Sequence, residues 1–269
     1  MNHWHSLVLL LLLPLSILNA NDDLTDADLI VTKANQAAFY NGNDGRSEIR
    51  MLIVDSQQRK QRRQFVVLRR NQPETAGDQQ FLIRFSQPSD IRNTVFLINK
   101  HTTTDDDRWL YLPGLDLVKR IAAGDKRTSF VGSDFFYEDV SGRGLEEDTH
   151  QLMETTEQFY VVKNTPKQPA LVEFTEYTVW IDKQTFMPVK TEYKDNNDKI
   201  YRRIEAQKIV DVQGFATAVR IKASNLRSGS YTLNQLRNIS YDINIPANVF
   251  TERSLRNPPR EWLKPPAKR

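Results

Sequence analysis

Alternation of apolar and polar residues runs through most of the sequence and predicts a protein built from β-strands. From residue 46 onward, segments rich in Val, Ile, Phe, Tyr and Thr recur, most of them bounded by Gly, Pro, Asn or Asp. About ten to twelve strands in succession favour an antiparallel meander. We expect the strands near residues 46–55, 61–70, 79–87, 93–100, 107–112, 115–121, 157–163, 171–182, 186–194, 199–211, 215–223 and 230–243.

Short polar connections exclude a parallel α/β sheet for the C-terminal half. The separators at residues 182–184, 195–198 and 212–214 are rich in Asp, Asn, Gln and Gly. Parallel neighbours need a crossover of roughly a dozen residues or more, whereas hairpins need only a few. These separators therefore predict hairpins.

Two regions depart from the strand pattern. Between Thr25 and Tyr40 small and apolar residues recur at helical spacing, with Thr25 as the expected N-cap and Asn41-Gly42 as the stop. Residues 122–156 contain glycine loops around a short aromatic segment. We expect one amphipathic helix in the first region and a second helical element in the other.

The chain opens with an apolar run over residues 7–18. That run is shorter than the ~20 residues of a membrane span and matches the core of a secretory signal peptide. Small Ala20 and the acidic pair Asp22-Asp23 follow it, so we expect a signal peptide of residues 1–20, cleaved after Ala20. The first six residues contain no Lys or Arg, which leaves a retained anchor as the alternative.

Composition narrows the chemistry. The sequence has no Cys, which excludes disulfides, thiolate nucleophiles and Cys-ligated zinc. The net charge of +3 is too small to indicate a nucleic-acid partner. Basic residues cluster within 59–70, but Phe65 is the only aromatic residue among them, so the bases of a single strand would find few stacking partners. We expect a solvated strand face there, with lipid headgroups as the alternative contact.

No catalytic grouping is evident. His101 and His150 stand far apart in the sequence, and neither a catalytic triad signature nor a phosphate-binding loop occurs. Acidic clusters at residues 105–107 and 146–148 lack the alternating ligand spacing of a calcium loop. We expect exposed acidic turns, no metal, no cofactor and no enzymatic activity.

Apolar side chains occupy both faces of several predicted strands. Phe81, Ile83 and Phe85 share one face of their strand, and Trp109 and Tyr111 share a face of another. A long sheet that curls around a few small helices can leave an apolar cavity, and a cavity without catalytic groups suits an acyl chain.

The centre of the chain carries a long, specific signature. It reads WLYLP at residues 109–113, KRI at 119–121, DK at 125–126 and SFVGSDFFYED at 129–139. This pattern resembles that of the outer-membrane lipoprotein-sorting proteins of the LolA-like and LolB-like superfamily. The likeness continues through residues 180–190, 225–229 and 246–253, so it covers nearly all of the chain after residue 20.

The resemblance implies a mainly β fold with few helices, in a single domain over residues 21–257. A single curved antiparallel sheet would form an open, incomplete β-barrel, with helices covering its concave face and a hydrophobic cavity for lipid or lipoprotein acyl chains. The founding members of the family are periplasmic carriers of lipoproteins. This chain is longer and is similar to an extended subgroup that often accompanies inner-membrane exporters. The family brings no catalytic residues.

These expectations define a candidate lipid-binding site. Its expected lining residues are Phe81, Ile83, Phe85, Trp109, Tyr111, Phe135, Phe136 and Trp180. The expected family signature loop comprises Pro113, Gly132, Ser133, Asp134, Tyr137, Glu138 and Asp139. The aromatic segment at residues 135–137 would follow the glycine turn and point inward, either as a plug of the core or as a lid on the cavity.

Expected partners follow from the same reading. They are lipid or lipoprotein acyl chains, with an inner-membrane transporter as a further candidate and transient contact with a membrane surface. We expect no nucleic-acid partner. We expect the protein to be a monomer. The alternative is a periplasmic subunit that carries nothing and docks to an exporter or envelope assembly. Residues 258–269, basic and rich in proline, are expected to form an extended tail.

Overall fold

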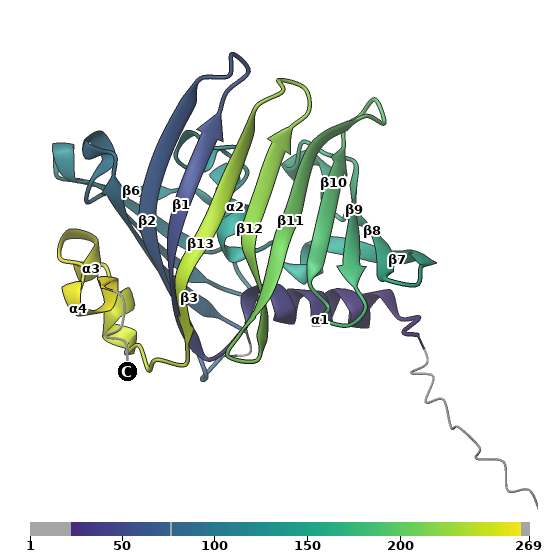
Figure 1. Cartoon of the computed structure of the whole chain (residues 1–269), viewed down its shortest axis with the longest axis horizontal. Coiled ribbons are helices and arrows are strands. Elements are labelled where there is room, and N and C mark those ends of the chain that lie inside the picture. The colour runs from purple at the N-terminus through teal and green to yellow at the C-terminus, as the bar shows by residue number, and fades with distance from the viewer. Residues whose placement is uncertain (1–22, 76, 265–269) are drawn as a thin grey trace, which may run out of the picture.

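Thirteen strands pair side by side into one curved antiparallel sheet in the computed structural model, which describes residues 23–75 and 77–264 (Figure 1). The strands are β1 (Asp44–Val54), β2 (Lys60–Asn71), β3 (Gln79–Gln87), β4 (Val95–Lys100), β5 (Asp107–Leu112), β6 (Leu117–Ile121), β7 (Asp148–Thr155), β8 (Phe159–Pro166), β9 (Glu176–Asp182), β10 (Pro188–Lys194), β11 (Ile200–Val212), β12 (Phe215–Asn225) and β13 (Tyr231–Tyr241). The expected meander and the expected hairpins are confirmed. The sheet does not close on itself.

Strand order explains the shape. Across the sheet the strands run β6-β5-β4-β3-β2-β1-β13-β12-β11-β10-β9-β8-β7. The consecutive strands β6 and β7 thus lie at opposite edges, and residues 122–147 connect them. We call this connection the strap. It passes over the concave face, and the short helix α2 (Tyr137–Ser141) within it lies behind the central strands in Figure 1.

Three further α-helices complete the described chain: α1 (Ala27–Phe39), α3 (Arg253–Arg256) and α4 (Arg260–Leu263). None of the helices in the described part is long and apolar enough to cross a bilayer. Helix α1 packs against β7, β8 and β12, with Ile30 and Ala34 buried. It begins one residue later than expected, because the Asp26 carboxylate, not Thr25, accepts hydrogen bonds from the backbone N–H groups of Asp28 and Leu29.

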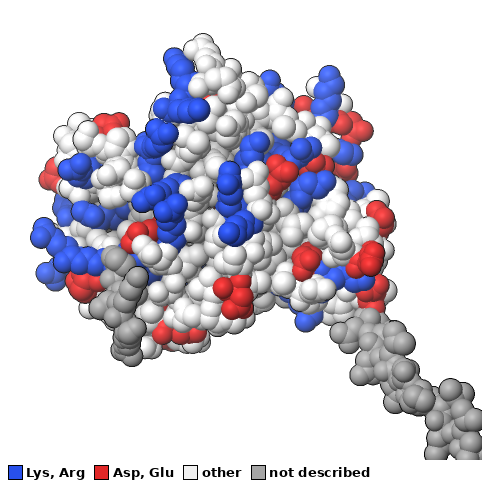
Figure 2. All heavy atoms as spheres, viewed as in Figure 1, with Lys and Arg blue, Asp and Glu red and all other residues white. Residues whose placement is uncertain are grey.

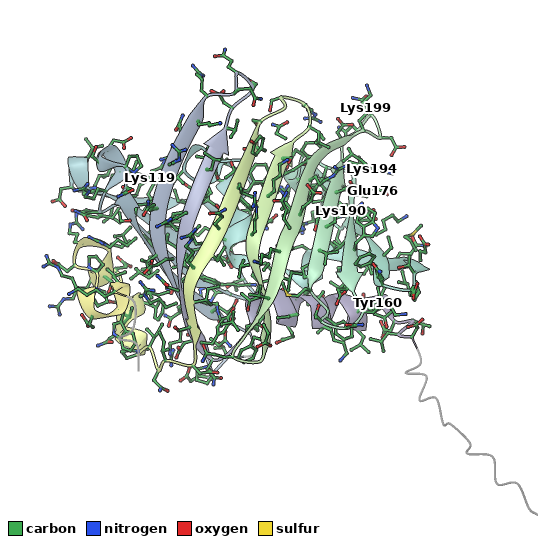
Figure 3. The ribbon with its side chains drawn as sticks, in the orientation of Figure 1. Lys119, Tyr160, Glu176, Lys190, Lys194 and Lys199 are labelled. Carbon is green, nitrogen blue, oxygen red and sulfur yellow. The ribbon has the colours of Figure 1, made fainter. Side chains whose placement is uncertain are left out.

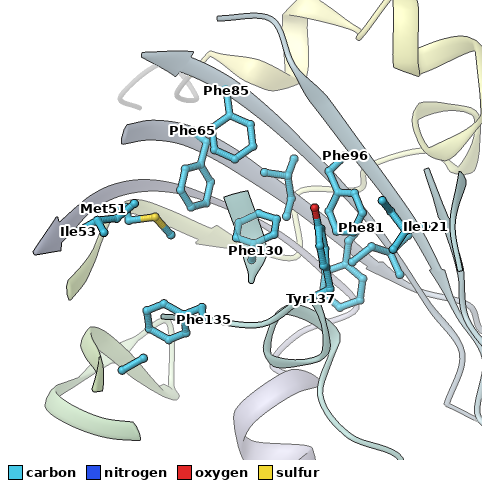
Figure 4. Close-up of a cluster of buried hydrophobic side chains, with 13 residues drawn as sticks. Met51, Ile53, Phe65, Phe81, Phe85, Phe96, Ile121, Phe130, Phe135 and Tyr137 are labelled. Carbon is cyan, nitrogen blue, oxygen red and sulfur yellow. The ribbon is translucent and has the colours of Figure 1, made fainter. Parts of the chain in front are cut away.

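Both faces of strands β2 to β4 are apolar and covered. The concave face carries a cluster in which Phe130 of the strap meets the aromatic side chains of the sheet (Figure 4). On the convex face, Leu68, Leu82 and Leu97 pack against Phe250 and Leu255 of the C-terminal segment. The N-terminal half of the sheet is therefore a sandwich of strap, sheet and C-terminal segment.

Two local expectations are wrong. Residues 258–264 are not extended: they include α4, where Leu263 is buried and its carbonyl oxygen accepts from Arg46 Nη2 at 2.9 Å. A strand, β7, also occupies the end of the 122–156 region that was expected to be helical and looped. Because β7 is an edge strand and most of its residues are exposed or half-buried, its sequence shows little alternation of apolar and polar residues. The signal peptide expected over residues 1–20 and the end of the tail, residues 265–269, lie outside the described residues.

Candidate functional site

Two adjoining hollows lie between the concave face, α1 and the strap. The first has a volume of about 250 Å³ and is bordered by β1, β2, β3 and β13, with Ile49, Phe65 and Ile83 in its wall. The second has a volume of about 280 Å³ and is bordered by β9 to β12, with Val179 and Ile204 in its wall. Each is close to the lower limit of ordinary ligand pockets, and together they fall within that range.

Phe135 stands between the two hollows. It lines both of them, as do Ala38, Phe39, Asp139 and Ile221. Its side chain is 7 % exposed and belongs to the concave cluster, beside Phe130 in the strap (Figure 4). Phe135 thus partitions the space under the sheet.

Phe136, its neighbour, has a different role. Its ring lies between two guanidinium groups, with the central carbon of Arg202 at 4.2 Å and that of Arg127 at 5.1 Å from the ring centroid. Cations over an aromatic face stabilise such a stack. Phe136 was expected in the lining of the cavity, but it lines neither hollow, because its ring packs against these two arginines instead. Phe135 and Tyr137 are buried as expected.

The acidic residues of the signature fasten the strap to the sheet. Asp134 accepts hydrogen bonds from Ser230 Oγ at 2.6 Å and from Thr232 Oγ1 at 2.7 Å, at the start of β13. Asp139 forms an ion pair with Arg202 of β11 and accepts from the backbone N–H of Phe136 at 2.6 Å. The signature loop is thus a set of attachments across the concave face.

Glu138 is the centre of a buried ionic network. It pairs with Arg127, with Arg143 at 3.1 Å and with Lys126 at 3.5 Å. Arg127 reaches on to Glu173 at 2.7 Å. Burial opposes ionisation of Glu138, but the three surrounding cations hold the pKa of its carboxyl below the usual value.

The glycine at position 132 lets the strap turn before these attachments. Its φ of +76° lies in the left-handed region that glycine adopts without steric conflict. Ser133 follows it, buried, and its hydroxyl donates to the carbonyl oxygen of Phe130 at 2.7 Å. At the earlier end of the signature, Pro113–Leu115 forms the 3₁₀ turn between β5 and β6, as the Pro-Gly pair predicts.

Some expected lining residues lie where they were expected and others do not. Phe81 and Ile83 line the first hollow, and Phe85 belongs to the same cluster without lining it. Trp109 and Tyr111 pack on the opposite, convex face, against the C-terminal segment. Leu110 between them points to the concave side, so the inward face of β5 was assigned one residue out of register.

Trp180 also faces outward. The Nζ atom of Lys190 lies 3.4 Å from the centroid of its ring, and Lys190 stands on β10 near Lys194 and Glu176 (Figure 3). Ile181, the next residue of β9, is the one that lines the second hollow. Trp109, Tyr111 and Trp180 are therefore removed from the candidate lining.

Sequence reasoning missed the charged residues under the sheet. Arg69 belongs to the basic cluster that was expected to form a solvated strand face, yet it lies on the concave side and lines the first hollow. The alternation of side chains contained this signal, because Phe65 and Arg69 are four positions apart on one strand and so share a face. Arg202 gave no such signal, since a buried arginine is rare unless paired.

No metal centre emerges in the part of the chain that the structure describes, where His, Asp and Glu nowhere gather in threes in a form that could hold an ion. The expected acidic turns are ion-paired instead. Asp148 binds Arg143 at 2.8 Å and accepts from the Tyr177 hydroxyl at 2.7 Å, and Asp106 binds Arg108 at 2.7 Å.

Lys100 lies buried beside the end of α1. Its Nζ donates to the carbonyl oxygen of Ser141 at 2.7 Å and lies 5.5 Å from the ring centroids of Phe39 and Tyr40. Burial lowers the pKa of Lys100 to about 8, partly offset by the charge of Asp106.

This shift predicts a pH dependence of stability. The unfolded chain holds the Lys100 proton up to its ordinary pKa of 10.5, whereas the folded protein releases it near pH 8, so folding is favoured as pH rises between these values. From about pH 7 to about pH 9.5 we expect Lys100 to add roughly 1–2 kcal/mol to the unfolding free energy. Urea titrations of wild type and Lys100→Met at both pH values test this. An equal rise in the variant would contradict it.

Comparison with known proteins identifies a family model and several solved structures that are similar to this chain. A family model with the description of an uncharacterized protein matches residues 77–257. No curated protein matches the sequence. Among solved structures, a DUF1329 family protein from Desulfovibrio piger is 25% identical with a TM-score of 0.77, and the match covers 85% of this chain and 97% of that one.

Two other solved structures share the architecture. A domain from Vibrio parahaemolyticus, classed with outer membrane lipoprotein-sorting proteins, is 25% identical with a TM-score of 0.76 over 86% of this chain and 98% of its own. A LolA superfamily protein from Nitrosomonas europaea is 16% identical with a TM-score of 0.66 over 86% and 99% of the two chains, which shows the open curved barrel. Because the family model matches well over half of the sequence, the chain belongs to that family, and it shares its fold with solved structures of a DUF1329 family protein, an outer membrane lipoprotein-sorting domain and a LolA superfamily protein.

Proposed function

We propose that this protein is a periplasmic carrier that holds an acyl chain of a lipid or lipoprotein under its sheet without reacting with it. The observation that carries the proposal is the pair of apolar hollows enclosed by the concave face, α1 and the strap. The similarity to the Vibrio parahaemolyticus domain, which is classed with outer membrane lipoprotein-sorting proteins, supports a carrier. The acidic residues that line the second hollow, Glu138 and Asp139, are paired with arginines, which suits binding better than catalysis.

The energetics of an acyl chain suit these walls. Each buried CH₂ contributes about 0.8 kcal/mol, so a chain of roughly a dozen carbons offers about 9 kcal/mol before the cost of association. Micromolar affinity is then reachable from apolar contact.

Export with removal of residues 1–20 is part of the proposal, and the intact mass of protein recovered from the periplasm tests it.

A tryptophan placed in the wall should block binding. Ile221 lines both hollows from β12, so Ile221→Trp fills the space that a chain would occupy. Leu226→Trp places the same ring on the β12–β13 turn, where Leu226 is 43% exposed. We expect an acyl fluorophore to bind wild type and Leu226→Trp alike and Ile221→Trp at least about tenfold more weakly.

The same titration judges the proposal. Circular dichroism confirms that both variants are folded, and thin-layer analysis of the recovered probe confirms that it is not hydrolysed. If wild type shows no saturable binding up to the solubility limit of the probe, the carrier proposal is wrong.

Docking to an exporter or membrane is the second candidate function, and the convex face favours it. Lys and Arg gather over the central strands in Figure 2. Arg50, Arg220 and Arg237, on β1, β12 and β13, are exposed there. A basic face attracts anionic surfaces and raises association rates at low salt. Salt-sensitive binding to anionic vesicles without acyl-probe binding would favour this candidate over the carrier.

A further inference from the structure

Arg69 lies on the concave side, and its hydrogen bonds there involve no charged group. It donates to the backbone carbonyl oxygens of Asn41 and Gly42 and to the side-chain oxygen of Asn71. All of these acceptors are neutral. Within residues 23–75 and 77–264 neither Arg69 nor Arg63, which lies on the same face of β2, forms a salt bridge, but only Arg69 lines the first hollow. Five other arginines with largely buried side chains each pair with a carboxylate: Arg46, Arg108, Arg127, Arg143 and Arg202.

The position of Arg69 is the second observation. Its side chain belongs to the lining of the first hollow, whose other walls are mainly apolar, with Phe65, Val67 and Ile83 close to it along β2 and β3. A half-buried cation without an ionic partner is expensive, and burial lowers the pKa of Arg69 from its usual value. The carboxylates of Asp44 and Asp242 act on Arg69 and partly offset this effect, but neither forms a salt bridge with it, so an incoming anion would be its first direct ionic partner.

The hollow also has a direction. At one end of the hollow, Gly45 of β1 lies between Arg69 of β2 and Tyr241 of β13. At the other end, Met51 of β1 pairs with Asn234 of β13. Six residues of β1 separate these rows, which corresponds to about 20 Å along the strand. The cation therefore lies at one end of a long, narrow apolar space.

We propose that the first hollow binds a single-chain fatty acid, with its carboxylate on Arg69 and its chain directed along β1 toward Ile221. This inference rests on the proposed carrier function and names its ligand class. A planar carboxylate matches a guanidinium in geometry and in unit charge. The small volume of this hollow, about 250 Å³, favours one chain over two.

The test compares head groups at constant chain length. The assay measures how well palmitate and hexadecanol each displace a neutral acyl fluorophore from wild type at low salt and pH 8. We expect palmitate to bind about tenfold more tightly or better, because it adds a charge-assisted pair to the same apolar contacts. In Arg69→Gln the two affinities should become equal within about twofold, while Arg69→Lys should keep part of the preference.

Arg63→Gln is the matched control. Arg63 lies on the same strand and on the same face, but it does not line the hollow. Its replacement should leave the preference for palmitate unchanged. Hexadecanol affinity and circular dichroism report whether Arg69→Gln keeps the fold, since the wild-type side chain also holds the loop after α1.

The outcomes separate the two proposals. If wild type binds palmitate and hexadecanol equally well, the assignment of Arg69 is wrong while the carrier function stands. A preference lost in Arg63→Gln but kept in Arg69→Gln overturns the assignment in the same way. If wild type binds neither probe, both proposals are wrong.

Discussion

Replacing Glu138 with glutamine is expected to lower the unfolding free energy by about 3–5 kcal/mol. Glu138 is 3% exposed and is the common partner of Arg127 and Arg143. Glutamine keeps the shape of the side chain but removes its charge, so two buried guanidinium groups lose a shared counterion. Arg127 keeps Glu173 and Arg143 keeps Asp148, but the loss of a fully buried counterion is far more destabilising than the loss of a surface pair.

Glu147→Gln is the control for this prediction. Glu147 also pairs with Arg143, at 2.8 Å, and with Lys126, at 2.6 Å, but its side chain is 35% exposed. Water can solvate the cations there, so its loss should cost under about 1 kcal/mol. Urea titrations followed by circular dichroism measure both variants. Equal losses in the two would show that burial does not set the strength of the network.

The pH dependence of the same group provides an independent check. The folded pKa of Glu138 lies below its ordinary value of 4.5 because three cations surround it in spite of burial. Its stabilisation is therefore fully present above that value and is lost as pH falls through the folded pKa. Wild type should lose stability in acid more steeply than Glu138→Gln.

Phe130→Ala should be equally damaging, at about 3–5 kcal/mol, but for a different reason. Phe130 is 2% exposed, and its ring centroid lies 5.5 Å from that of Tyr137, 5.7 Å from that of Phe96 and 6.0 Å from that of Phe85 (Figure 4). Alanine would remove the ring that joins the strap to the sheet. The surrounding rings come from separate elements and cannot all move inward to fill the space.

Stability and binding should separate in this variant. Phe130 lines the first hollow, so its removal enlarges the apolar space while weakening the fold. We expect Phe130→Ala, kept below its unfolding temperature, to retain affinity for an acyl fluorophore. Leu115→Ala, at a position 73% exposed, should change neither property. A loss of binding together with retained stability would contradict the assignment of Phe130 to the core.

The sequence was informative where local patterns decide structure. Alternation and turn residues were enough to predict the meander, because hairpin neighbours are also neighbours in sequence. The face of a strand was harder to assign. Trp109 and Trp180 look like core residues, but each lies one position away from the true inward residue, Leu110 or Ile181. A bulky side chain can be buried on either face when both faces are covered.

The candidate site was less predictable than the fold. Its walls combine strands far apart in the chain with the strap, and the pairing of Glu138 with its arginines depends on that assembly. The tail was missed for a similar reason. Its prolines and charges predicted an extended segment. Leu263 and Trp262 instead pack into the apolar cluster on the convex face, which holds this part of the tail against the sheet.

The position of β1 beside β13 has a consequence for how the chain reaches this structure. Every other neighbouring pair in the sheet is formed by consecutive strands, but β1 and β13 join the two ends of the meander, where Gly45 meets Tyr241. Each half can pair locally and early, while this seam requires the closure of nearly the whole chain and is slow to form. Until β13 arrives, β1 and β12 present open edges that can pair with other chains. A truncation before Tyr231 should therefore leave two half-sheets that aggregate.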